Sequence, residues 1–168
     1  MESDIDLINK ALSGGSHHYG VLIQRYSDYL FGLGMRLTAG NRALAEDISQ
    51  QSFLKSYTYL ASFDRTKSYK HWLTGIAVNC FRDAVKKEQA YTGLETINEP
   101  TYTPELEEGG SEFFRLIKPL DPEHRSLFTL RYVYDHSVDE IAELTQLNAG
   151  TVKSKLSRAM EVLRQCHA

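Results

Sequence analysis

The chain has 168 residues, of which 42% are hydrophobic and 24% are charged, and this composition is ordinary for a globular protein. No apolar run approaches the roughly 20 residues that a membrane-spanning helix needs, and residues 1–10 lack the apolar stretch of a secretory signal. The two cysteines, Cys80 and Cys166, are too few and too far apart for a disulfide scaffold, so we expect a protein of the reducing cytoplasm.

The net charge of −3 argues against a protein that coats nucleic acid indiscriminately, but the charges lie in blocks. Residues 64–87 hold six basic and two acidic side chains, whereas residues 88–112 hold seven acidic side chains and neither Lys nor Arg. Residues 149–168 are basic again, with four Lys or Arg against one Glu. We therefore expect two basic surfaces separated by an acidic tether.

Apolar residues recur at helical spacing through the first half of the chain, and signals for β-hairpins are weak. The pattern predicts helices over residues 4–12, 16–37, 42–60 and 69–87, with a polar loop at 61–68. Asn41 is a suitable N-cap for the third of them. These elements are expected to form a first domain over residues 1–88.

Residues 89–111 are acidic, contain Gly and Pro, and mostly lack a period, so they are expected to be a flexible linker. Residues 112–168 are expected to form a second domain. Helices are predicted at 111–117, 122–133, 137–144 and 149–165, and the S-x-x-E capping box at Ser137–Glu140 marks the start of the third. The expected fold class is all-α, with two small helical domains.

Residues 137–164 have the pattern of a helix-turn-helix: a short capped helix, a four-residue turn and a longer basic helix. Such a second helix can enter the major groove with its N-terminal part against the base edges. Its polar face is expected to carry the DNA contacts, made by Thr151, Lys153, Ser154, Lys155, Ser157 and Arg158. The pattern alone leaves open a plain helical hairpin with a solvated face.

The motifs resemble those of bacterial sigma factors. Residues 137–144 and 150–159, which read SVDEIAEL and GTVKSKLSRA, are similar to region four of these proteins. Residues 45–57, AEDISQQSFLKSY, resemble the polymerase-binding helix of region two, and residues 71–79, HWLTGIAVN, resemble its promoter-reading part. The chain is identified as a member of the sigma-70 family, and the absence of further regions points to its extracytoplasmic-function (ECF) group.

The resemblance implies a transcription initiation factor that binds core RNA polymerase, recognises the −35 element of promoter DNA and melts the −10 element. Core polymerase would contact the helix that carries Asp47, Gln50, Gln51, Phe53 and Lys55. Flipping a base out of the DNA stack costs a few kcal/mol, and a pocket built by the loop at residues 61–68 and the start of the next helix would offset this cost. The −10 contacts would come from Phe63, Arg65, Lys67, Lys70, His71, Asn79, Arg82 and Lys86.

The sequence departs from the family pattern at four positions. Gly75 and Val78 stand in a helix where relatives often carry Arg or Lys, which predicts weaker or different DNA binding. Gln146 stands where relatives usually have the glycine of the turn, and a left-handed conformation there would cost about 1 kcal/mol. Asn148 stands in place of a frequent Pro and can still cap the last helix.

Other functional classes fit the sequence less well. Phosphate-binding, dinucleotide-binding and HExxH motifs are absent from the sequence, and no histidine spacing resembles a structural zinc site, so we expect neither an enzyme nor a cofactor. A sigma-like decoy that sequesters an anti-sigma factor, or a plain helix-turn-helix regulator, remains as an alternative. The resemblance also implies an anti-sigma factor as a partner, and membrane insertion is not expected.

Overall fold

The computed structural model describes residues 1–92 and 108–167, and these residues form helices, turns and short loops without a strand. Its elements are α1 (Asp4–Leu12), α2 (His17–Leu37), α3 (Arg42–Thr58), η1 (Leu60–Ser62), α4 (Tyr69–Thr92), α5 (Glu108–Ile117), α6 (Pro122–Phe128), η2 (Thr129–Val133), α7 (Val138–Thr145) and α8 (Ala149–Cys166). The predicted all-α class is confirmed. In the described part of the chain, no helix is long and apolar enough to cross a membrane.

The helix boundaries follow the capping residues of the sequence. Asn41 and Asn148 accept hydrogen bonds from the amides of Leu44 and Thr151, and both capping-box bonds between Ser137 and Glu140 are present. Several predicted bounds were wrong by more than one residue. The third helix ends at Thr58 instead of residue 60, and the fourth continues to Thr92 instead of ending at residue 87. The fifth begins at Glu108 instead of residue 111, and the segment predicted as one helix over 122–133 changes at residue 129 into a π-helix. Residues 93–107 of the predicted linker lie outside the described residues.

Helices α1 to α4 share one apolar core. Fully buried leucines from α2 and α4, among them Leu30, Leu33 and Leu73, pack in its centre. Gly34 lets α2 and α3 approach closely, because a Cβ at this position would lie 3.1 Å from the Cα of Ala45. The buried hydroxyls are satisfied within the core; the Tyr19 hydroxyl, for example, donates to the carbonyl of Phe53.

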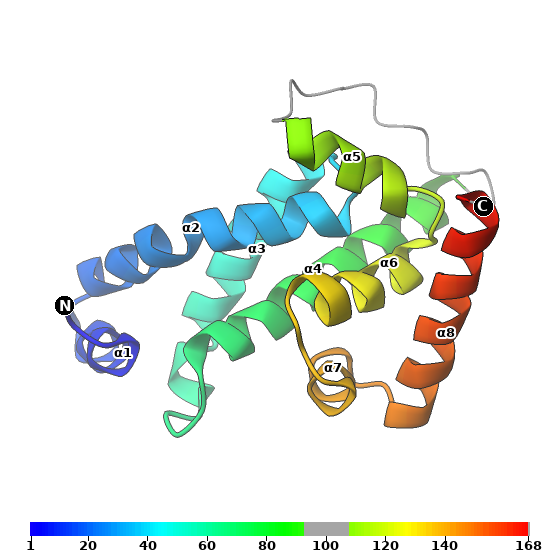
Figure 1. Ribbon diagram of the computed structural model, residues 1–168. Coiled ribbons are helices and arrows are strands. Elements are labelled where there is room, and N and C mark those ends of the chain that lie inside the picture. The colour runs from blue at the N-terminus through cyan, green and yellow to red at the C-terminus, as the bar shows by residue number, and fades with distance from the viewer. Residues whose placement is uncertain (93–107, 168) are drawn as a thin grey trace.

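The C-terminal helices pack directly on this bundle (Figure 1). A second apolar cluster joins Leu130, Ile141 and Leu144 to Val78 of α4, whose side chain is fully buried. Phe114 of α5 lies against the turn after α2, where a Cβ on Gly40 would be 3.1 Å from its ring. The two halves of the chain therefore share an interface in this structure, which composition and periodicity did not predict.

The turn between α7 and α8 contains a left-handed residue at Gln146, which is the condition under which strain is expected there. Gln146 has φ 60° and ψ 23°, a conformation that strains an L-residue other than glycine. We expect Gln146→Gly to raise the free energy of unfolding by about 0.5–1 kcal/mol, because removing the Cβ strain outweighs the entropy that glycine loses. Chemical denaturation measures this change. Gln146→Ala is the control, since it keeps a Cβ at the same φ, and an equal gain with alanine would refute the strain argument.

Candidate functional site

Helix α3 has one face buried in the core and one face exposed to solvent. Ala45, Ile48 and Ser52 face the core, whereas Asp47, Gln50 and Gln51 are exposed. The structure corrects one predicted contact: Phe53 is 8% exposed and belongs to the core, so its ring is not available to a partner.

Leu54 takes the place on the surface that was predicted for Phe53. It is 60% exposed, although it is a large apolar residue. It follows Asp47 by seven residues and Gln50 by four, so the three side chains lie on one face of the helix. Lys55 is half-buried, with its Nζ 3.5 Å from a carboxylate oxygen of Asp83 in α4. The spacing from Asp47 is the signal that could have identified Leu54.

The loop before α4 is held by local hydrogen bonds. Both the amide and the hydroxyl of Thr66 donate to Asp64, and these bonds lower the pKa of the Asp64 carboxyl. The guanidinium of Arg65 donates to the side chain of Asn9, 2.8 Å away, and remains exposed.

Phe63 is a second correction. It was predicted to contact DNA, but it is 3% exposed and lies between the rings of Tyr69 and Trp72. Trp72 is half-buried and packs against the same core. The buried Phe63 ring therefore packs under the loop residues and is not available to contact a base.

The predicted −10 residues of α4, together with Lys67 of the preceding loop, fall into two groups. Lys70, Asn79 and Lys86 are exposed, and the Nζ of Lys70 lies 4.5 Å from the centre of the Tyr29 ring. The other group, Lys67, His71 and Arg82, faces the C-terminal half of the chain.

Each member of this second group has a contact across the interface. The Nζ of Lys67 is 3.8 Å from a carboxylate oxygen of Glu143, and Arg82 donates to the carbonyl of Thr145 at 2.6 Å. The rings of His71 and His136 are 5.6 Å apart. In this arrangement α7 occupies part of the surface that the sequence assigned to promoter DNA.

The two departures in α4 lie at the same interface. A Cβ on Gly75 would be 3.4 Å from a methyl group of Leu144, and Val78 is buried in the cluster that α7 completes. An Arg or Lys at position 78 would place a charge in this apolar cluster, which is costly without a partner. The small, uncharged residues at these positions thus permit the closed packing of the two halves.

Polar contacts extend the interface beyond α4. Arg36 of α2 donates to the hydroxyl of Tyr134 at 2.9 Å, and burial raises the pKa of that phenol. Arg125 of α6 reaches the carbonyl of Leu37 at 3.3 Å. The sequence carried no signal for these pairs, because their partners are 88 to 98 positions apart.

The predicted −35 face of α8 is largely exposed. Lys153, Ser154, Ser157 and Arg158 are exposed, and Thr151 is half-buried near the N-terminus of the helix. Lys155 differs from them, because it is half-buried and forms an ion pair with Glu123 of α6. It therefore helps to fix α8 on α6 in this structure.

Comparisons with known proteins identify both halves of the chain. The sequence profile of the family described as "Sigma-70 region 2" matches residues 22–91, and that of "Sigma-70, region 4" matches residues 111–163. The chain is similar to the ECF RNA polymerase sigma factor SigW of Bacillus subtilis (strain 168), with 28% identity over 94% of this chain and 93% of the relative. It is also 28% identical to the ECF RNA polymerase sigma-E factor of Escherichia coli (strain K12), over 96% of this chain and 92% of the relative.

Two solved structures share the fold. CnrH in complex with the cytosolic domain of CnrY superposes with a TM-score of 0.68 at 21% identity, covering 98% of this chain and 97% of that chain. The sigma factor RpoE in complex with the anti-sigma factor NepR from Bartonella quintana has a TM-score of 0.72 at 21% identity, covering 88% and 94%. The two sigma-70 regions, matched in order over most of the chain, together with the similarity to ECF relatives along almost its whole length, show that it belongs to the ECF group of the sigma-70 family and is a transcription initiation factor.

Proposed function

We propose that three surfaces of this chain direct core RNA polymerase to promoters. The exposed face of α3, with Asp47, Gln50, Gln51 and Leu54, docks on polymerase. The basic edge of α4 and the preceding loop engages the −10 element, and the exposed face of α8 engages the −35 element. The α8 face carries the proposal: Lys153, Ser154, Ser157 and Arg158 stand free of intramolecular cover directly after a capped turn.

Residues 1–88 and 112–168 act as two domains in this proposal, joined by the acidic segment at 89–111. Since Lys67, His71 and Arg82 contact the C-terminal half, the two domains must separate before α4 can engage DNA. In this proposal polymerase engages both domains on binding, and this would supply the free energy for the opening. The polymerase performs the chemistry, and the chain itself acts in the cytoplasm as a binding factor rather than as an enzyme.

A further partner is an anti-sigma factor. Both related structures are complexes, and one of the bound partners is described as an anti-sigma factor. Such a partner would compete with polymerase for the α3 face or hold the two domains away from DNA. Pull-down with the purified chain as bait, in the presence and absence of excess core polymerase, would distinguish these two modes. Polymerase displaces a partner that covers the α3 face.

Reconstituted transcription tests the proposal. The purified protein is mixed with bacterial core RNA polymerase and genomic DNA of the source organism, and transcript starts are mapped. New starts that share motifs at −35 and −10 spacing are expected. Binding to core without any new start would instead support a decoy that sequesters an anti-sigma factor, and failure to bind core would leave a plain helix-turn-helix regulator.

Arg158→Ala is expected to weaken promoter binding about five- to thirtyfold, because a guanidinium contact to a base edge or phosphate contributes about 1–2 kcal/mol. Fluorescence anisotropy of the polymerase holoenzyme on labelled promoter DNA measures this change. Arg164→Ala is the matched control, since Arg164 is exposed on the same helix but pairs with Glu161. Equal losses for the two variants would show that the effect is only one of net charge.

A further inference from the structure

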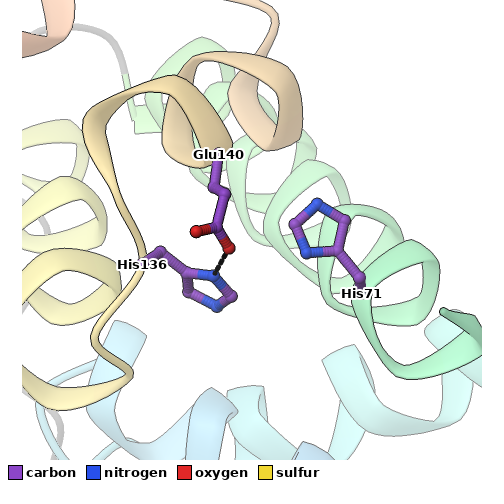
Figure 2. Close-up of side chains that lie close together, drawn as sticks. All are labelled: His71, His136 and Glu140. Carbon is purple, nitrogen blue, oxygen red and sulfur yellow. Dashed lines mark hydrogen bonds and ion pairs between the residues drawn. The ribbon is translucent and has the colours of Figure 1, made fainter.

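Two histidines and one glutamate meet across the interface between the two halves (Figure 2). His71 comes from the first turns of α4, His136 lies just before α7, and Glu140 is in the first turn of α7. One nitrogen from each ring and one carboxylate oxygen lie within 4.8 Å of one another. The Nδ1 of His136 is already 3.0 Å from the nearest Glu140 oxygen.

This donor set suits a divalent first-row transition-metal ion. Two imidazoles and one carboxylate are ligands that Zn²⁺ accepts, with bond lengths of about 2.0–2.2 Å. Tetrahedral ligand atoms at that distance are about 3.4 Å apart, so closing the widest gap here requires a movement of roughly 1–1.5 Å. Small rotations of two half-buried imidazole side chains can supply it.

We propose that His71, His136 and Glu140 bind such an ion, with Zn²⁺ as the representative, and that the ion holds the two domains in the closed arrangement. The proposed function did not need His136 or Glu140, and none of the predicted contacts with polymerase or DNA involves them. The ligands belong to different domains, so an ion bound by all three connects those domains directly.

The surroundings leave room for a fourth ligand. His71 and His136 line a cleft of about 560 Å³ between α2, α4 and the segment before α7, which also includes Tyr29 and Tyr134. Water can complete the coordination from this side. The repulsion between a bound cation and the two nearby lysines is reduced, because Lys67 is paired with Glu143 and Lys70 lies over the Tyr29 ring.

Hydrogen bonds to neighbouring residues also position two of the proposed ligands. The second oxygen of Glu140 accepts a hydrogen bond from the amide of Ser137, so the capping box orients the carboxylate. The amide of His71 donates to the Ser68 hydroxyl at 3.2 Å and fixes the start of α4. These contacts orient the Glu140 carboxylate and hold the backbone of His71 in place before the ion binds.

The consequence concerns regulation. In the closed arrangement His71, Lys67 and Arg82 are engaged by the C-terminal half. An ion that binds only this arrangement shifts the population away from the open form that promoter DNA requires. Zn²⁺ would therefore inhibit this initiation factor reversibly, and a chelator would restore it.

Metal binding is tested first on the full-length protein without polymerase. Metal-free protein is titrated with Zn²⁺ by calorimetry, and with Co²⁺, whose visible absorption reports tetrahedral coordination. One equivalent is expected, with at least a tenfold weaker affinity in each of His71→Ala, His136→Asn and Glu140→Gln. Glu140→Gln keeps the capping box, because glutamine can make the same bond to the Ser137 amide.

The matched control removes the other exposed metal-binding side chains. A variant with His17→Gln, His18→Gln, Cys166→Ser and His167→Gln should bind Zn²⁺ as the wild type does. Circular dichroism of every variant without metal confirms that it is folded. Unchanged affinity in the three single variants, or no binding by the wild type at about 1 mM Zn²⁺, would overturn the proposed site.

The regulatory part is tested separately by transcription. The reconstituted holoenzyme, with wild-type or His136→Asn protein, is assayed with and without one equivalent of Zn²⁺ added before core polymerase. Inhibition of the wild type but not of the variant is expected, with equal activity of the two in chelator. If Zn²⁺ binds but inhibits the wild type and His136→Asn equally, or inhibits neither, the proposal that the ion holds the two domains closed is wrong. The activity measured without metal reports independently on the proposed function.

Discussion

Replacing Leu54 with glutamate should reduce the affinity of the protein for core RNA polymerase by at least thirtyfold. Leu54 is 60% exposed at the centre of the α3 face, beside Gln50 and Gln51. A large apolar side chain with no intramolecular cover, surrounded by polar residues, has the environment of an interface hot spot, where truncation costs about 2 kcal/mol or more. A buried carboxylate at the same place adds a desolvation cost. Biolayer interferometry with immobilised core polymerase measures the change.

Val21→Glu is the control for this substitution. Val21 is an exposed apolar residue of α2, outside the three proposed surfaces, and its replacement introduces the same charge. Its affinity for polymerase should remain within twofold of the wild type, since surface substitutions away from special features usually have small effects. Wild-type affinity in Leu54→Glu, measured on folded protein, would place the polymerase contact elsewhere.

Val78→Arg should separate the two halves of the free protein and increase promoter binding at low polymerase concentration. Val78 is fully buried, but it packs with Leu130, Ile141 and Leu144 rather than with the core of α1 to α4. A charge there without a partner costs about 3–5 kcal/mol in the closed arrangement. The open arrangement avoids this cost, because it exposes position 78 to water. Small-angle scattering measures the expected increase in the radius of gyration.

Val78→Ala is the matched control for this experiment. It removes two methyl groups without adding charge, which should cost about 1–2 kcal/mol in the interface and leave most molecules closed. The radius of gyration should then stay near that of the wild type, and promoter binding should change little. An unchanged radius in a folded Val78→Arg protein would contradict the interface seen here.

The sequence predicted the local structure well where the signals are local. Asn41, Ser137 and Asn148 cap their helices as expected, because a cap depends only on residues within one turn. Gln146 has the left-handed conformation that its place in the turn implied. The exposed face of α8 likewise follows from helical spacing.

Predictions that depended on contacts distant in the sequence were less successful. The sequence predicts a polymerase contact for Phe53 and a DNA contact for Phe63, but both side chains are buried by aromatic and aliphatic neighbours from other helices. Val78 read as a missing basic residue, and the structure shows an apolar contact with the C-terminal half instead. Helical spacing assigns a side chain to a face of its helix, but it does not say which other element covers that face.

The most direct test of this account measures the distance between the two halves before and after polymerase binds. Spin labels at Ala61→Cys and Asp139→Cys, in a Cys166→Ser background, report across the interface from two exposed positions. In free protein we expect one narrow population at short distance, and with core polymerase a shift to longer distances. The same short distance in a polymerase complex that initiates transcription would show that the closed arrangement does not block the promoter surface, and would contradict the account.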